Sequence, residues 1–301
     1  MSDAPAFTAF PLDRADALRR DEAGLAVLSA RRDARVATFW GLKPLVRERD
    51  GALAPVYRAG EAFVAGASLT VFLGLDAERR PVFAAALEGE AEPAHAEVGA
   101  RFAELREAAS NMDPTEASIL GAARSVLAWH ASHGFCANCG GTTAPAFGGW
   151  KRVCAACATE HFPRVDPVVI MLIVRNGRVL LGRAPAWPAR AYSCLAGFVE
   201  PGETIAEAAR REAREETGVI LGEVGFLMSQ PWPFPSSLML GLRAEALSDA
   251  ITLDAQELVD ARWFTRDDVE AMMAGTHPIA RTPPPIAVAH HLLSWWLENS
   301  D

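Results

Sequence analysis

The segment spanning residues 197–219 constrains the fold of this chain more than any other, because it dictates its own secondary structure. It reads GFVEPGETIAEAARREAREETGV. The Pro-Gly pair at 201–202 ends any strand that arrives from the preceding residues. Thr204, with Glu207 three positions later, has the spacing of a capping box, and Gly218 stands where a helix should end. The segment therefore predicts a strand end, a loop and a helix of roughly three to four turns.

The carboxylates of this predicted helix point in an unusual direction. At about 100° per residue, Ile205, Ala209 and Ala213 share one face of the helix. Glu212 and Glu216 fall on or beside that face. A solvated lattice of salt bridges is the ordinary explanation of a glutamate-rich helix, but carboxylates directed towards a core are costly and need a cation. Hard oxygen ligands of this kind suit Mg²⁺ or Mn²⁺.

Four of the five cysteines form two CxxC pairs separated by 14 residues. This spacing is close to that of a zinc ribbon with four thiolate ligands, which leaves no open coordination position. The sequence therefore predicts one structural zinc ion per chain. A redox dithiol and four unrelated free thiols are the alternatives, and the paired arrangement favours zinc and a reducing compartment. The predicted zinc ligands are Cys136, Cys139, Cys154 and Cys157.

The overall composition limits the classes of protein. A chain of 301 residues is long for one domain. A net charge of −9 argues against a general nucleic-acid binder held by phosphate contacts, although bound metal ions would still admit a polyphosphate substrate. We find no apolar run of the roughly 18 residues that a membrane span needs, and no basic start followed by an apolar stretch. A soluble cytoplasmic protein without a membrane partner is expected.

Strand and helix patterns differ between the two ends of the chain. Residues 1 to about 125 alternate apolar segments with glycine and charged breaks, which predicts a small α/β or mainly β domain with strands at 34–40, 44–49, 69–75 and 81–89, and helices at about 94–109 and 115–131. In the C-terminal part, the wholly apolar run 168–174 is typical of a strand buried on both faces. Further strands are predicted at 178–184, 191–200, 224–230, 237–247 and 261–265, with a final amphipathic helix at 286–299.

A rigid stretch of alternating prolines and aromatic residues joins two of these strands. Residues 231–236 read PWPFPS. Proline fixes φ, so the two rings lose little freedom when they bind a flat ligand. Packing of the same rings in the core of the loop is an equally weighted explanation.

Residues 197–219 resemble the signature of the Nudix hydrolase family, G-x5-E-x7-R-E-U-x-E-E-x-G-U, in which U is aliphatic. All nine specified positions are filled, by Gly197, Glu203, Arg211, Glu212, Ala213, Glu215, Glu216, Gly218 and Val219. The resemblance implies hydrolysis of a nucleoside diphosphate linked to another moiety, with divalent cations bound by carboxylates of the helix. Arg211 is expected to orient those carboxylates.

A second motif narrows the resemblance to one branch of the family. Ser229 to Ser237 matches S-Q-P-W-P-F-P-x-S, and it follows a Nudix signature and a four-cysteine ribbon. This combination is similar to the NADH pyrophosphatase branch, which implies cleavage of NAD(H) to nicotinamide mononucleotide and AMP. Bacterial members also remove NAD caps from RNA. The motifs cover about residues 130–301.

The resemblance also implies the residues of the site. Catalytic groups would be Glu212, Glu215, Glu216 and Glu257, and the Mg²⁺ or Mn²⁺ ligands would be the Ala196 carbonyl, Glu212, Glu216 and Glu257. Substrate contacts would fall on Phe162, Phe198, Gln230, Pro231, Trp232, Pro233, Phe234, Pro235, Ser236, Ser237 and Ala289. Members commonly have tyrosine at the position of Phe162, so a hydroxyl contact is lost there. Some members have an acidic residue at the position of Gly149, so no substrate contact is assigned to this glycine.

These observations predict an α+β chain of three domains. They are an N-terminal α/β scaffold or dimerisation domain at 1–130, a zinc ribbon at 131–163, and a Nudix α/β/α sandwich with a mixed sheet at 164–301. The resemblance implies a homodimer. Two alternatives stay open: a Nudix hydrolase for ADP-ribose or another dinucleotide, and a non-catalytic zinc-ribbon adaptor for nucleic acid.

Overall fold

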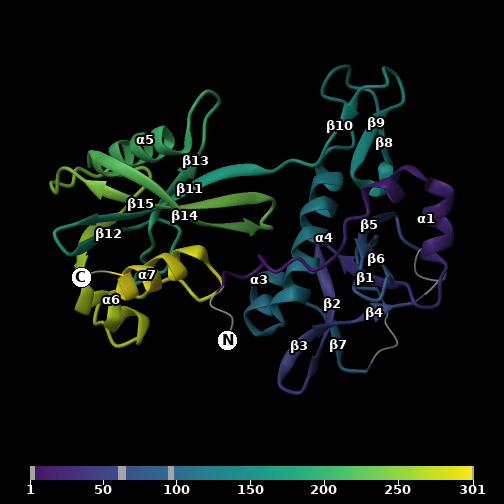
Figure 1. Ribbon diagram of the computed structural model, residues 1–301, viewed down its shortest axis with the longest axis horizontal. Coiled ribbons are helices and arrows are strands. Elements are labelled where there is room, and N and C mark those ends of the chain that lie inside the picture. The colour runs from purple at the N-terminus through teal and green to yellow at the C-terminus, as the bar shows by residue number, and fades with distance from the viewer. Residues whose placement is uncertain (1–3, 60–65, 94–97, 300–301) are drawn as a thin grey trace. The chain divides into compact units, whose positions relative to one another are not determined.

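A computed structural model describes residues 4–59, 66–93 and 98–299. Contacts divide the chain into two units, one formed by residues 6–165 with 232–236, and the other by 166–231 with 237–301 and the first five residues. The ribbon falls in the first unit, and the division into three domains stays a prediction. Within the described residues, we find no helix with the length and apolarity required to span a membrane. Figure 1 labels the elements.

The N-terminal unit contains a mixed sheet of order β3-β2-β1-β6-β5, in which β4 also pairs with β1 and β7 with β2. Its core includes Leu25, Val36, Phe72 and Phe83. The strands are β1 (Arg35–Trp40), β2 (Lys43–Arg49), β3 (Ala52–Pro55), β4 (Tyr57–Arg58), β5 (Leu69–Leu75), β6 (Pro81–Leu87) and β7 (Ala100–Phe102). The helices are η1 (Asp16–Arg20), α1 (Glu22–Ser29), α3 (Leu105–Ala108), η2 (Ala109–Asn111) and α4 (Pro114–Ser132).

One predicted helix of this unit forms as expected, and the other forms only near its end. The α4 helix starts at Pro114, one residue before the predicted range of 115–131, and the Asp113 carboxylate accepts hydrogen bonds from the backbone N–H groups of Thr115 and Glu116. The helix predicted at about 94–109 is wrong over residues 100–102, because β7 pairs with β2 there, and right over 105–108, where α3 forms. Only the short α3 follows, and residues 94–97 lie outside the described part. Sheet pairing outweighed the local helical pattern.

The zinc ribbon is a small antiparallel sheet of order β10-β9-β8. Its elements are β8 (Thr143–Ala146), η3 (Phe147–Gly149), β9 (Lys151–Cys154) and β10 (Glu160–His161). Each CxxC pair therefore lies beside a strand of this sheet, which brings the two pairs to the same end of it.

The C-terminal unit is a sandwich of helices on both faces of a mixed sheet (Figure 1). The sheet order is β14-β15-β11-β12-β16, with β13 also paired to β11, and β11 is parallel to β15 but antiparallel to β12. Its elements are β11 (Asp166–Arg175), β12 (Arg178–Arg183), β13 (Leu195–Phe198), α5 (Ile205–Thr217), β14 (Leu221–Trp232), β15 (Ser237–Ala246), β16 (Asp260–Thr265), α6 (Arg266–Met273) and α7 (Val288–Asn299).

Alternate residues of β11 enter two separate cores. Val169 and Met171 pack with the alanines of α5 on one face of the sheet. Ile170 and Leu172 pack with α6 and α7 on the other. This two-sided burial explains why the strand is a continuous apolar run, and it confirms the predicted sandwich with a mixed sheet.

Candidate active site and zinc ribbon

The α5 helix forms as its local sequence predicts. Thr204 Oγ1 accepts a hydrogen bond from the Glu207 backbone N–H at 3.3 Å, and the Glu207 carboxylate accepts one from the Thr204 N–H at 2.7 Å. Gly218 ends the helix with φ 69°, a left-handed conformation that glycine adopts without strain. Ala209 and Ala213 are buried against the sheet. The register of the helix is therefore set by its caps and its alanine face.

Three carboxylates converge beside α5. Glu212 and Glu216 are only 9% and 7% exposed, as expected from their direction on the helical wheel. Glu257, from the loop before β16, joins them, so that one carboxylate oxygen of each lies within 4.8 Å of the others. The structure therefore brings together the three carboxylates that the family resemblance assigned to divalent cations.

The electrostatics of this carboxylate group fit a bound cation. Burial raises the pKa of Glu216 to about 8, with the Glu212 and Glu257 charges adding to the shift. Burial also raises the pKa of Glu212, which Arg211 opposes. Glu216 Oε2 is buried and has no hydrogen-bond partner among the described residues. Because buried carboxylates with an unpartnered oxygen are costly, a divalent cation with oxygen ligands suits this group.

Arg211 holds the surrounding carboxylates in position. Its Nη1 donates to Glu212 Oε1 at 2.8 Å, and its Nε donates to Glu203 Oε1 at 2.7 Å. Its Nη2 donates to the Phe198 carbonyl at 2.9 Å, which ties the helix to the end of β13. The Arg211 hydrogen bonds lower the pKa of Glu203 to about 2. These contacts are those expected of a residue that orients Glu212.

Gly197 lies on β13 directly against the Glu212 side chain of α5. A Cβ atom at this position would stand 1.9 Å from Glu212 Cδ. Any larger residue would therefore displace the Glu212 carboxylate. The sequence marked this glycine only as a signature position, whereas the structure gives the steric reason for it.

Glu215 occupies a different environment from the other three glutamates. Its side chain is 59% exposed, and one carboxylate oxygen lies 3.2 Å from Arg211 Nη1. Within the described residues it is not part of the converging group. A catalytic role of Glu215 stays a prediction.

Several predicted substrate contacts of the C-terminal unit can be placed. Phe198 is 59% exposed at the end of β13, and Ala289 is buried on α7. The Gln230 amide is engaged internally, since its Nε2 donates to the Ile286 carbonyl at 2.7 Å and its Oε1 accepts from the Val288 N–H at 2.8 Å. Gln230 therefore holds the chain at the start of α7. Ser237 begins β15 opposite Asp166.

The proline-aromatic loop, residues 232–236, belongs to the N-terminal unit by its contacts. The Phe7 ring meets Trp232 and Phe234 edge-on, with centroids 6.3 and 6.0 Å apart. The Arg124 guanidinium lies 4.7 Å from the Phe234 centroid, and Ser125 Oγ donates to the Pro235 carbonyl at 3.1 Å. Both aromatic rings are half-buried. These contacts support packing of the loop, while a stacking role of the rings stays a prediction.

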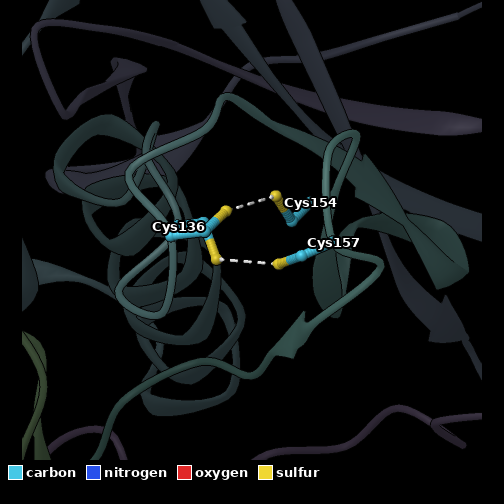
Figure 2. Close-up of side chains that lie close together, drawn as sticks. Cys136, Cys154 and Cys157 are labelled. Atoms are coloured by element: carbon cyan, nitrogen blue, oxygen red, sulfur yellow. Dashed lines mark hydrogen bonds between the residues drawn. The ribbon is translucent and has the colours of Figure 1, made fainter.

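The four predicted zinc ligands converge in the ribbon. Their sulfur atoms all lie within 4.8 Å of one another, with Cys136 and Cys157 at 3.7 Å and Cys139 and Cys154 at 3.5 Å. Figure 2 shows Cys154 and Cys157 facing Cys136 from the opposite loop. Tetrahedral ligands at the usual Zn–S distance would be about 3.8 Å apart, whereas disulfide sulfurs would be at about 2.05 Å. The four thiols therefore fit a zinc ion.

Sequence reasoning missed polar neighbours of these thiols. His161 Nε2 lies 3.2 Å from Cys136 Sγ, and Asn138 Nδ2 lies 3.8 Å from Cys157 Sγ. Donors of this kind stabilise thiolates and orient metal ligands. Their signal in the sequence is their closeness to the CxxC pairs, because Asn138 lies inside the first pair and His161 follows the second by four residues.

Comparisons with known proteins agree with this arrangement. Three domain models match the chain consecutively from residue 33 to 282, with only residue 130 between them. Residues 33–129 match an NADH pyrophosphatase-like rudimentary NUDIX domain, residues 131–162 an NADH pyrophosphatase zinc ribbon domain, and residues 163–282 a NUDIX domain. The fold and the carboxylate site thus define a Nudix protein. The chain belongs to the Nudix family and has the domain composition of its NADH pyrophosphatase branch.

Named relatives match 60% and 68% of this chain. The NAD-capped RNA hydrolase NUDT12 of Homo sapiens is 46% identical over 193 residues, which cover 60% of this chain and 42% of that protein. The NAD-capped RNA hydrolase NudC of Mycobacterium bovis is 42% identical over 208 residues, covering 68% of this chain and 66% of that protein. The chain thus spans about two fifths to two thirds of these relatives. A NUDIX hydrolase structure from Nitrosomonas europaea matches with TM-score 0.45 and 24% identity, over 55% of this chain and 91% of that chain.

Proposed function

We propose that this protein hydrolyses the diphosphate of NAD(H) to nicotinamide mononucleotide and AMP, and removes NAD caps from RNA. The observation that supports this most is the convergence of Glu212, Glu216 and Glu257 beside Arg211. The SQPWPFP motif and the relatives named NAD-capped RNA hydrolases support the choice of substrate.

The carboxylate group would hold Mg²⁺ or Mn²⁺, which neutralise a diphosphate and lower the pKa of bound water. Glu212 is fixed by Arg211, so its oxygens stay in place as the substrate binds. Glu216 offers a buried, unpartnered oxygen as a ligand. Glu257 is the exposed member of the three, so we assign to it the proton that leaves the attacking water. The water oxygen then bonds to one phosphorus as the bridging P–O bond breaks.

The other parts of the proposal concern architecture. We assign a structural zinc ion to the ribbon, because four thiolates leave no open position for chemistry. We also propose a homodimer in which the N-terminal unit provides contacts between subunits, and a cytoplasmic location. The homodimer rests on the family resemblance, and the location rests on the composition and apolar pattern of the sequence.

Purified protein incubated with NADH, NAD⁺ and ADP-ribose, with Mg²⁺ or Mn²⁺, tests the proposal. We expect reduced nicotinamide mononucleotide and AMP from NADH, and nicotinamide mononucleotide and AMP from NAD⁺, with a higher kcat/KM for NADH than for ADP-ribose. A higher kcat/KM for ADP-ribose would favour the alternative hydrolase. Failure to cleave any of the three would favour the non-catalytic adaptor.

A further inference from the structure

An open cavity of 390 Å³ lies within the N-terminal unit, at the carboxyl ends of β1 and β6. These two strands are parallel, and Trp40 at the end of β1 pairs with Leu87 at the end of β6. The remaining walls include Leu127 of α4, Pro145 of β8 and Arg152 of β9. Ligands of open α/β sheets bind outside the carboxyl ends of parallel strands, so the position of this cavity favours a binding site.

Most residues of the lining are apolar. They include Phe39, Leu69, Leu87 and Leu127, which come from β1, β5, β6 and α4. Small-molecule sites have volumes of roughly 300–1,000 Å³ and combine such apolar walls with a few polar groups that fix the ligand. The cavity is therefore large enough for a small organic molecule with an apolar body.

Arg152 is the buried cation of the lining, with 9% of its surface exposed. Its guanidinium donates to neutral acceptors, from Nε to Thr143 Oγ1 at 2.7 Å, from Nη2 to the Thr143 carbonyl at 2.7 Å, and from Nη1 to His130 Nδ1 at 2.8 Å. Because a guanidinium has five N–H groups, these bonds leave one N–H group on each Nη atom for a further acceptor.

The charge of Arg152 has no counter-charge beside it. Burial lowers the pKa of Arg152, and no carboxylate of the described part of the chain contributes to this shift. The His130 imidazole is neutral, since its Nδ1 accepts the hydrogen bond from Arg152. A buried charge without an opposite charge is costly, so this wall of the cavity favours an anionic ligand.

The charges of the lining also limit the charge of that ligand. Glu88, at the exposed edge of the cavity, is the acidic side chain of the lining. Its carboxylate would repel a ligand with several negative charges more strongly than a ligand with one. Excess negative charge beyond that matched by Arg152 would stay unpaired among apolar walls. These features favour a monoanion.

We propose that this cavity binds a small organic monocarboxylate with an apolar body. The N–H groups that remain on the two Nη atoms of Arg152 can donate to the two oxygens of one carboxylate. The apolar body would pack against Leu69, Leu87 and Leu127. This inference does not depend on the proposed hydrolase function, because it concerns a cavity whose lining belongs to the N-terminal unit.

The test titrates naphthoate, a rigid aromatic monocarboxylate, into the full-length protein and follows the methyl NMR signals of its leucines. The signals of Leu69, Leu87 and Leu127 should shift and saturate, with a Kd of about 1 mM or lower for a ligand of this size. Naphthamide has the same shape without the charge, so it should bind roughly 10- to 100-fold more weakly. Inorganic phosphate should shift none of the three signals.

Two variants assign the binding to Arg152 and to the cavity. Arg152→Met should weaken naphthoate binding roughly 10- to 100-fold and leave naphthamide binding nearly unchanged. Ala131→Phe keeps Arg152, which also joins the ribbon to α4, and places a ring at an exposed position of the lining. It should abolish binding of both probes. Ala23→Phe is its matched control, because Ala23 is an exposed alanine of α1 outside this lining.

Several outcomes would overturn the inference. They are equal affinities for naphthoate and naphthamide, wild-type affinity in Ala131→Phe, an equal loss in Ala23→Phe, and no shift at about ten times the expected Kd. Binding of phosphate in place of naphthoate would overturn it too, since it would indicate an anion site without a place for an apolar body. If Arg152→Met does not fold, the comparison of naphthoate with naphthamide and the Ala131→Phe variant decide.

Discussion

Two groups of side chains that are negatively charged as metal ligands converge in different ways. One group is the four cysteines of the ribbon, and the other is the three glutamates beside α5. The cysteines come from two tight loops in a stretch of 22 residues, residues 136–157. The glutamates come from one helix and from a loop about 40 residues later, and two of the three are buried. Zinc is therefore expected to determine the local fold of the ribbon, whereas the carboxylates are positioned by a core that forms without metal.

This difference predicts opposite consequences of removing one ligand. Loss of a carboxylate should spare the fold and abolish chemistry, because the core packing of α5 relies on its alanines rather than its glutamates. Loss of a thiolate should release zinc and unfold the ribbon.

The largest effect is expected from Glu216→Gln. This substitution removes a charge that binds the cation but keeps the shape of the side chain, so kcat should fall by roughly 10³-fold or more while the melting temperature changes little. Steady-state kinetics with NADH and thermal denaturation measure the two quantities, with Glu223→Gln on the exposed side of β14 as control. A variant that keeps a tenth of wild-type kcat would show that Glu216 is not a ligand.

A smaller loss of activity is expected from Gly197→Ala. The added Cβ would lie 1.9 Å from Glu212 Cδ, so the carboxylate must move by an ångström or more. A displacement of that size typically costs about 100-fold in rate. Gly225→Ala is the control, because a Cβ there meets no atom within 4 Å. Unchanged kcat/KM in Gly197→Ala would contradict the close packing of β13 on α5.

The ribbon should respond to loss of a thiolate through its fold. Cys154→Ser should lower the zinc content from about one ion per chain to near zero and destabilise the N-terminal unit by several kcal/mol. Elemental analysis and chemical denaturation measure these effects. Cys194→Ala, which changes the cysteine outside the ribbon, should keep its zinc. Folded, active wild-type protein without zinc would reject the assignment.

The smallest effect concerns the contacts that join the ribbon to α4. His130 Nε2 lies 2.7 Å from the Gly149 carbonyl, and Arg152 Nη1 donates to His130 Nδ1 at 2.8 Å, so the imidazole is neutral. Burial lowers its pKa to about 4, and the Arg152 charge adds to this shift. Since the unfolded value is about 6.5, the unfolded state binds more protons between these pH values. The contribution of His130 to the free energy of unfolding is therefore complete above pH 6.5 and is lost as the pH falls towards 4.

This prediction is measured as a difference between variants, because protonation of the cysteines also affects the ribbon at low pH. The substitution His130→Gln should decrease the free energy of unfolding. This decrease should be about 1–3 kcal/mol larger at pH 7.5 than at pH 4.5. A pH-independent difference for His130→Gln would mean that the imidazole does not titrate in this way.

The sequence by itself determined the features that depend on short spacings. The caps of α5, its alanine face and the inward direction of Glu212 and Glu216 follow from the helical period, and the structure reproduces them. The convergence of the four cysteines follows in the same way from two CxxC loops that flank a short hairpin.

Only the tertiary structure decided the features that depend on distant segments. It placed Glu257 beside α5, engaged the Gln230 amide at the start of α7, and packed Trp232 and Phe234 against Phe7. It also replaced part of a predicted helix with β7, which pairs with β2. The physical reason is that helix caps and chelating loops gain their stabilising contacts within a few residues, whereas these positions gain theirs only when segments far apart in the chain pack together.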